Sequence, residues 1–135
     1  MKKTVLSVLA LSALVFSCKK DDDKKSTRDQ LLGKWNLTSE IENHHYSGAD
    51  HFDTTKVPAG YATAEFKSND SCIQIFNNQP DKSTFKVDGS TLIFKYANNS
   101  DTVTIKSITG SELKIWYKEP YTTDEWYEYT DVFNK

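Results

Sequence analysis

The pattern of apolar and polar residues divides the chain into two unequal parts. Residues 4–16 form an almost unbroken apolar run behind Lys2 and Lys3, whereas apolar and polar residues alternate from Gly33 onward. Alternation with a period of two is typical of strands that bury one face. It predicts eight strands, within residues 33–41, 61–67, 71–77, 83–87, 90–96, 101–108, 111–118 and 125–133.

Short turn signals join most of these segments, and they favour an all-β fold. Asp88-Gly89 and Thr109-Gly110 each separate two predicted strands. Residues 26–32 predict one helical turn, because Thr27 and Gln30 have capping-box spacing. No segment has the pattern of a long crossover helix. We expect an eight-stranded up-and-down antiparallel meander barrel with a short N-terminal helical turn, since closure removes the sheet edges. A β-sandwich is the alternative.

The first strand and the segment after it have different patterns. Trp35, Leu37 and Ile41 are expected on one face of the first strand. Residues 43–59 are mostly polar and show no strand pattern. They are predicted to form a long loop, a mobile cover over one end of the barrel.

The apolar run at the N-terminus predicts a secretory signal, residues 1–17. It is too short for a membrane-spanning helix, which needs about 20 apolar residues, and a basic start followed by a short apolar stretch is typical of such signals. Val15-Phe16-Ser17-Cys18 resembles the lipobox of bacterial lipoproteins. The resemblance implies cleavage before Cys18 and acylation of Cys18, and several acyl chains would anchor the protein stably to a membrane.

A charged segment follows the cysteine. Residues 18–30 are predicted to be the lipidated Cys18 and a charged tether, because residues 19–25 carry only Lys and Asp and cannot pack a core. Cys18, the lysines and the run Asp21-Asp22-Asp23 also resemble the signal that carries some Gram-negative lipoproteins to the cell surface. This resemblance implies a lipid-anchored outer-membrane protein whose folded domain faces the cell surface.

The folded domain, residues 31–135, resembles the lipocalin-like family. "LLGKWNLTS" is similar to the opening of that family, a short helical turn followed by Gly33-x-Trp35 on the first strand. "TFKVDGSTLIF" and "VTIKSITGSELKIWY" are similar to small lipocalin-like bacterial lipoproteins. The resemblance implies an up-and-down barrel in which Trp35 packs at the closed end beneath the cavity, with Gly33 beside it.

An eight-stranded barrel is either filled by its own side chains or holds one small ligand. The alternation predicts the inward residues Ala64, Phe66, Ile73, Ile75, Phe85, Val87, Leu92, Phe94, Val103, Ile105, Leu113, Ile115, Tyr117, Tyr127 and Tyr129. Tyr offers an apolar body and a polar tip to a ligand. We therefore take as candidate ligand-binding residues Ala64, Phe66, Phe94, Tyr117, Tyr127 and Tyr129.

Trp116 and Trp126 depart from this inward pattern. Trp116 shares a face with Lys114 and Lys118, and Trp126 shares one with Glu128. Two outward tryptophans would form an aromatic patch for a protein or a glycan. Ordinary cross-strand pairing in the last two strands is the alternative.

Composition and single residues narrow the function further. The formal charge is −2 and no basic stripe is present, which argues against nucleic-acid binding. Cys72 has no partner once Cys18 is acylated and is expected to be a buried thiol. The three histidines, in the polar segment, match no zinc spacing, so no metal site is predicted. No cofactor or catalytic motif is found, and we expect no enzyme.

Two functions therefore remain open. The first is a lipid-anchored envelope lipoprotein whose barrel binds a small apolar or amphipathic ligand, with the membrane as its other partner through the lipid on Cys18. The second is an interaction module with a filled barrel, whose surface binds a protein or a glycan.

Overall fold

The structure, a computed structural model, describes residues 25–135. The predicted signal peptide, the predicted acylation site Cys18 and the charged run that follows it to residue 24 lie outside the described residues. Within the described part, no helix is both long and apolar enough to cross a bilayer.

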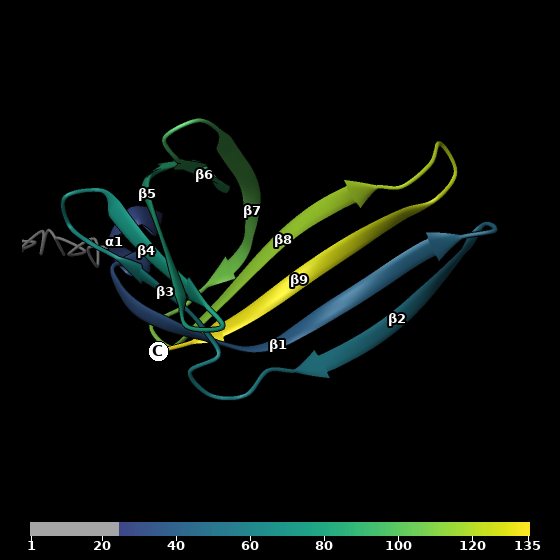
Figure 1. Ribbon diagram of the computed structural model, residues 1–135, viewed down its shortest axis with the longest axis horizontal. Helices are drawn as coiled ribbons and strands as arrows, with labels where there is room; N and C mark the ends of the chain where they lie inside the picture. The colour runs from purple at the N-terminus through teal and green to yellow at the C-terminus, as the bar shows by residue number, and fades with distance from the viewer. Residues whose placement is uncertain (1–24) are drawn as a thin grey trace, which may run out of the picture.

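The chain forms one short helix and nine antiparallel strands (Figure 1). Eight strands follow one another around a closed barrel, which the pairing of the first strand with the last completes, and one further strand is added beside the first. The predicted all-β class, the eight-stranded barrel and the short helix are confirmed. The elements are α1 Thr27–Leu31, β1 Gly33–Tyr46, β2 Ala49–Lys56, β3 Ala62–Phe66, β4 Ser71–Phe76, β5 Gln79–Asp88, β6 Thr91–Lys95, β7 Ser100–Ile108, β8 Glu112–Pro120 and β9 Trp126–Asn134.

Helix α1 begins with a side-chain cap that differs from the predicted one. The Ser26 hydroxyl oxygen accepts a hydrogen bond from the backbone N–H of Asp29 at 3.1 Å, so the capping pair is Ser26 with Asp29 rather than Thr27 with Gln30. A serine at this position satisfies one of the free N–H groups of the first turn. Arg28 then donates to an Asp70 carboxylate oxygen, from Nε at 2.8 Å and Nη2 at 2.6 Å, which fastens the helix to the β3–β4 turn.

The core fills the end of the barrel beside α1. Trp35 is fully buried, and its indole N–H donates to the Leu31 carbonyl oxygen at 2.6 Å. Lys135 places its ammonium 4.5 Å from the centre of the Trp35 ring. The structure therefore puts Trp35 at the sealed end of the barrel, where burying a Trp indole requires a partner for its N–H. The buried cluster consists of Leu31, Trp35, Ala64, Phe66, Cys72, Phe85, Leu92, Phe94, Ile105, Leu113 and Ile115.

Strand β1 is longer than the barrel and changes neighbours along its length. On one side its residues 33–36 pair with β3 and its residues 39–46 pair with β2. On its other side it pairs with β9 as far as His45. Strand β8 is bonded to β7 only as far as Trp116. Four strands, in the order β8, β9, β1, β2, therefore continue beyond the barrel (Figure 1). We call their residues 117–120, 126–130, 39–46 and 49–56 the extension.

A β-bulge marks the start of the extension. The register of β1 against β9 shifts between Leu37 and Ser39, and the Thr38 hydroxyl donates to the Val132 carbonyl oxygen at 3.0 Å. An extra residue in one strand reverses which side chains face inward. Beyond the bulge the even-numbered residues of β1 continue the barrel's inner face. The predicted placement of Ile41 with Trp35 and Leu37 is therefore wrong, because Ile41 pairs with Thr130 on the outer face.

The predicted long loop over residues 43–59 is also wrong. Strand β1 continues to Tyr46, and β2 returns from Ala49. Between them Ser47 and Gly48 have φ values of 54° and 73°, which suits the tight turn of a two-residue hairpin. Every residue of β2 is exposed. Because neither face of this hairpin packs on a core, its sequence lacks the apolar alternation that identifies a strand, and no mobile cover exists there.

The inner side of β4 differs from the prediction as well. Cys72 pairs with Phe66, and Gln74 pairs with Ala64, so these two residues face the interior. Ile73 pairs with Glu65 and belongs to the opposite face together with Ile75. The segment is apolar at both sets of positions, so alternation alone could not choose between them.

We predict that the backbone of Gly33 cannot accept a side chain without a cost. Its φ of +112° is a conformation that L-residues rarely adopt, whereas a Cβ would meet only the end of the Lys135 side chain, at 3.7 Å. Gly33→Ala should lower the free energy of unfolding by about 1–3 kcal/mol in urea denaturation. Gly110→Ala is the control, since open space and an ordinary φ surround it. Equal stability of the two variants would contradict the assigned backbone conformation.

Candidate functional site

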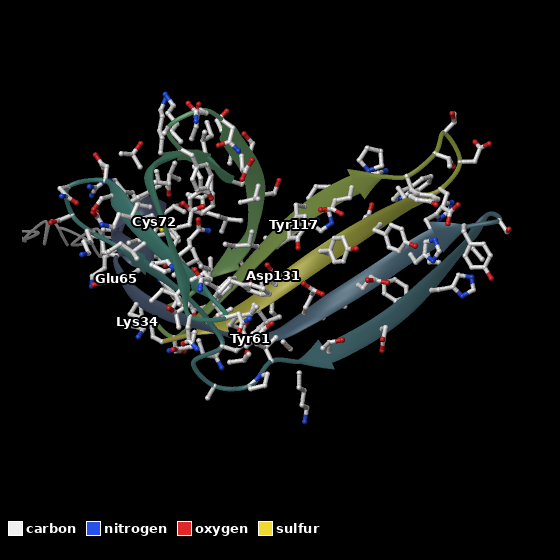
Figure 2. All side chains as sticks on the ribbon, in the orientation of Figure 1. Lys34, Tyr61, Glu65, Cys72, Tyr117 and Asp131 are labelled. Carbon is white, nitrogen blue, oxygen red and sulfur yellow. The ribbon has the colours of Figure 1, made fainter. Side chains whose placement is uncertain are left out.

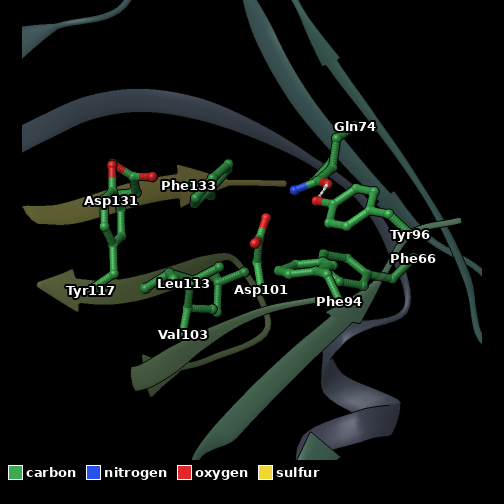
Figure 3. Close-up of a pocket in the computed structure, with 12 residues that line it drawn as sticks. Phe66, Gln74, Phe94, Tyr96, Asp101, Val103, Leu113, Tyr117, Asp131 and Phe133 are labelled. Atoms are coloured by element: carbon green, nitrogen blue, oxygen red, sulfur yellow. Dashed lines mark hydrogen bonds between the residues drawn. The ribbon is translucent and has the colours of Figure 1, made fainter. Parts of the chain in front are cut away.

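The interior of the barrel is not completely filled. A cavity of about 170 Å³ lies next to the packed core, between β3, β4, β6, β7, β8 and β9 (Figure 3). A dry cavity of about 150 Å³ is enough to admit benzene, so this space suits one small ligand or part of a larger one. It is lined by Ala64, Phe66, Gln74, Phe94, Tyr96, Asp101, Val103, Leu113, Ile115, Tyr117, Asp131 and Phe133.

The cavity continues toward the extension. A second hollow of about 250 Å³ adjoins it, and the two share a wall of Ala64, Gln74, Tyr117, Asp131 and Phe133. The second hollow reaches Glu40 of β1 and the exposed ring of Phe76. Trp35 and Leu31 seal the opposite end. The barrel therefore opens toward the extension, and Tyr117 and Asp131 lie where the two meet (Figure 2).

A few polar groups interrupt the apolar lining. The Tyr96 hydroxyl donates to Gln74 Oε1 at 2.7 Å, as Figure 3 shows. Burial raises the pKa of Tyr96 to about 12, helped by the nearby carboxyl of Asp101. Tyr96 therefore remains a neutral hydrogen-bond donor at any ordinary pH. Mostly apolar walls with a small number of fixed polar groups are typical of ligand sites.

Asp131 is the least satisfied of these polar groups. Its Oδ1 is buried and has no hydrogen-bond partner within the described residues. Burial, with a smaller effect from the neighbouring carboxylate of Glu40, raises the pKa of the Asp131 carboxyl to about 7. Leaving a buried acceptor unpaired costs free energy. A ligand that donates a hydrogen bond or carries a positive charge would relieve this cost.

The predicted site residues fall into two groups. Ala64, Phe66, Phe94 and Tyr117 line the cavity, and the first three are almost fully buried. Tyr127 and Tyr129 do not line it, because they lie on the part of β9 that belongs to the extension. Sequence reasoning missed the polar members Gln74, Tyr96, Asp101 and Asp131. Asp131 could have been found, because it stands two residues after Tyr129 in an alternating strand.

The tryptophans do not form one aromatic patch. Trp116 pairs with Thr130, and the Lys106 ammonium lies 4.7 Å from its ring centre. The Trp126 ring stacks on His45 at 3.8 Å and has the Lys118 ammonium 3.9 Å from its centre. Both therefore point to the outer face, and each ring is engaged by a neighbouring lysine. This arrangement agrees with the alternative prediction that the two tryptophans take part in ordinary cross-strand pairing and do not form a joint binding patch.

The histidines lie within the extension rather than in a loop. His44 Nε2 lies 2.7 Å from an oxygen of Glu125, and His45 Nδ1 lies 2.8 Å from an oxygen of Asp50. The hydrogen bond with His45 lowers the pKa of the exposed Asp50 carboxyl. Across residues 25–135, no three His, Cys, Asp or Glu residues are grouped as metal ligands would be.

Cys72 is a free, fully buried thiol, as predicted. Burial raises its pKa to about 12, although a hydrogen bond with Ser83 opposes the shift. A nucleophilic or metal-binding cysteine needs the thiolate form. Cys72 is therefore a core residue.

Comparison with known proteins agrees with this architecture. A family model described as a lipocalin-like domain matches residues 31–115, more than half of the chain. The chain belongs to the lipocalin-like domain family. A solved structure, a lipocalin-like protein from Bacteroides uniformis ATCC 8492, is similar with a TM-score of 0.50 and 13% sequence identity. The match covers 78% of this chain and 98% of that chain, and at this identity it shows the fold alone. No curated protein matches the sequence.

We predict that Asp131 makes the stability of the protein fall as the pH rises. Its folded pKa of about 7 exceeds the ordinary 3.8, so the folded state retains a proton that the unfolded state releases. This contribution is fully present below about pH 4 and is lost as the pH rises to about 7. Asp131→Asn should flatten that part of the profile and raise the free energy of unfolding at pH 8 by about 1–2 kcal/mol, since water at the opening screens part of the effect.

The measurement is urea denaturation at a series of pH values. Asp88→Asn, at an exposed turn, is the control and should follow the wild-type profile. A wild-type slope in Asp131→Asn would show that this carboxyl is not held in an apolar site.

Proposed function

We propose that this chain is a lipid-anchored protein of the bacterial cell envelope whose barrel binds one small amphipathic ligand. The lipocalin-like fold suggests a ligand-binding barrel, and proteins of this family are typically binding proteins rather than enzymes. The observation that carries the proposal is the cavity with a buried, unpaired Asp131 carboxyl at its mouth.

The lining restricts the chemistry of the ligand. Aromatic and aliphatic side chains such as Phe66, Phe94 and Leu113 suit an apolar body. Asp131 suits an ammonium or a hydroxyl group, because either would donate to its free oxygen. An anion is disfavoured, since Asp101 and Asp131 both border the space. The preferred ligand is therefore a small apolar molecule that ends in an amine.

The size of the cavity limits the affinity. Burial of about 200 Å² of apolar surface at roughly 25 cal/mol per Å² contributes about 5 kcal/mol before association costs. Loss of translational and rotational freedom removes much of this gain. Even without these costs, 5 kcal/mol corresponds to a dissociation constant of about 0.2 mM, so a fragment that fills only the cavity should bind in the millimolar range.

The anchor is the second part of the proposal and rests on the sequence. The apolar residues 4–16 and the lipobox-like stretch that ends at Cys18 support acylation of Cys18. The run Asp21-Asp22-Asp23 supports an outer-membrane location facing the cell surface. Among the described residues, α1 begins at Thr27 on the sealed end of the barrel. The opening and the extension lie toward the other end, so an anchor at Cys18 leaves both accessible.

The interaction module is the second candidate function. The extension favours it, because apart from Tyr117 and Glu40 at its base this part of the sheet does not line the cavity or the adjoining hollow. A protein partner for the extension is compatible with a ligand in the barrel.

We predict that the barrel distinguishes ligands by charge. In isothermal titration of the full-length protein in neutral detergent, 2-phenylethylamine should bind with one-to-one stoichiometry. The neutral 2-phenylethanol should bind more weakly, and phenylacetate should not bind measurably, because Asp131 favours a donor and repels an anion. Ala64→Trp should abolish binding by filling the space between the two hollows.

Ser107→Trp is the matched control, because Ser107 is exposed on the outside of β7. It should bind 2-phenylethylamine like the wild type. If Ala64→Trp does not fold, Asp131→Leu provides the second test and should remove the preference for the amine over the alcohol. Absence of saturable binding by all three compounds would reject the ligand-binding function.

The anchor has its own test in whole cells. Cys18→Ala should prevent acylation and move the protein from the membrane fraction to the soluble fraction, as followed by fractionation and mass spectrometry. Cys72→Ala is the control and should stay with the membrane, since Cys72 lies in the core. Membrane association of Cys18→Ala with an unchanged mass would disprove the lipoprotein assignment.

A further inference from the structure

The inner face of the extension carries a continuous ladder of aromatic rings. Cross-strand pairing places Tyr129 beside Tyr117 and His44 beside Tyr127 and His51. Neighbouring ring centres lie 4.2–6.2 Å apart along the whole series. We call this surface the ladder face. Its rings, in order from the barrel outward, are Tyr117, Tyr129, Tyr127, His44, Tyr46 and His51.

Carboxylates stand beside the rings. The registers place Glu42 next to Tyr129, and Glu119 next to Tyr127. Glu40 and Asp131 pair at the inner end, and Asp53 pairs with Glu42. The lysines of these strands lie on the outer face, where Lys118 covers Trp126. The ladder face therefore carries negative charge, with no Lys or Arg among its described residues.

These carboxylates repel one another and act on the rings. Burial raises the pKa of Glu40, and the charges of Glu42 and Glu119 raise it further. Burial and the same glutamates raise the pKa of Tyr129. Among the described residues, Glu40, Glu42 and Glu119 form no ion pair with Lys or Arg. A cation on this face would relieve the repulsion and would also lie over electron-rich rings.

No other strand of the described chain is layered over this face, and only the Tyr121 ring meets it, at the edge of Tyr127. Strand β2 is hydrogen-bonded only to β1, and β8 beyond Trp116 is hydrogen-bonded only to β9. Figure 2 shows the side chains of the extension standing free of the barrel. The rings of Tyr117, Tyr127 and Tyr129 are half-buried against one another, yet no second layer packs on them. Such an uncovered aromatic face needs an explanation, because sheet faces are usually packed or kept polar.

The spacing of the charges fits one kind of occupant. Side chains on one face of a strand repeat every second residue, at roughly 6.6–6.8 Å. Glu40 and Glu42 on β1 have this spacing, and so do the tyrosines on β9. An extended polypeptide presents its alternate side chains at the same repeat. Basic residues at alternate positions would therefore each meet a ring and a carboxylate.

We propose that the ladder face binds an extended polypeptide segment with Lys or Arg at alternate positions. The juxtaposition of stacked rings and unpaired carboxylates on one uncovered sheet face carries the proposal. It goes beyond ligand binding in the cavity and does not depend on it. The lysine or arginine chains would lie over Tyr117, Tyr127 and Tyr129, with Glu40, Glu42 and Glu119 as their counter-ions.

The test compares two labelled peptides of identical composition by fluorescence anisotropy with the full-length protein in neutral detergent. One alternates Lys and Ser over eight residues, and the other carries four Lys followed by four Ser. We expect the alternating peptide to bind at least about fivefold more tightly, and both affinities to fall as salt is added. Equal affinities would show that the repeat is not recognised and would overturn the proposal.

Substitutions locate the binding surface. The triple variant Glu40→Gln, Glu42→Gln, Glu119→Gln should weaken binding by about tenfold or more, because it removes the counter-ions. The control variant, Glu65→Gln, Glu112→Gln, Glu128→Gln, removes the same number of negative charges from residues outside the ladder face. This control should change the affinity by less than about twofold. An equal loss in both triple variants would reduce the effect to net charge and overturn the proposal.

A third variant tests the rings with the charges intact. Tyr127→Leu with Tyr129→Leu should weaken the alternating peptide by about three- to tenfold and bring its affinity close to that of the block peptide. Circular dichroism of each variant establishes that the sheet is retained, and the triple variant decides the outcome if the leucine variant unfolds. Saturable binding of maltoheptaose without binding of either peptide would replace the cationic partner with a glycan.

Discussion

The whole architecture depends on the pairing of β1 with β9. These strands are distant in sequence, yet they remain hydrogen-bonded from Asn36 to His45. Their first part closes the barrel, and their second part runs beyond it to form the centre of the extension. Closing long-range strand pairs costs chain entropy, and the buried cluster around Trp35 and Leu113 offsets that cost. The barrel core therefore stabilises a piece of sheet that has no core of its own.

The bulge at Thr38 makes the inner face of the barrel continuous with one face of the extension. Because it reverses the alternation of β1, the even-numbered residues from Glu40 to Tyr46 continue the inner face of the barrel. Along the inner face, the apolar lining of the barrel is therefore followed directly by the pair Asp131 and Glu40. Beyond this pair come the tyrosines of the ladder face, with carboxylates beside them. The cavity and the ladder face share this acidic boundary, so both are suited to positively charged groups. One would hold a small amine and the other a basic polypeptide.

Sequence reasoning found the elements whose alternation reflects a buried face. All eight predicted barrel segments became strands, and Gly33-x-Trp35 marked the first of them. The predictions were wrong wherever the apolar residues of a segment are not the residues whose side chains face the interior. The β1–β2 hairpin is polar on both faces, β4 is apolar on both faces, and a bulge moved Ile41 outward. The candidate site was found in part, because apolar residues indicate a lining, whereas only the fold shows that the polar residues Gln74 and Asp131 also face the cavity.

A crystal structure of the protein with 4-bromophenethylamine would test the central claim most directly. We expect an anomalous bromine peak inside the barrel between Phe66, Phe94 and Leu113, with the ammonium within hydrogen-bonding distance of Asp131. An interior closed by rearranged side chains, or a bromine peak only outside the barrel, would contradict it.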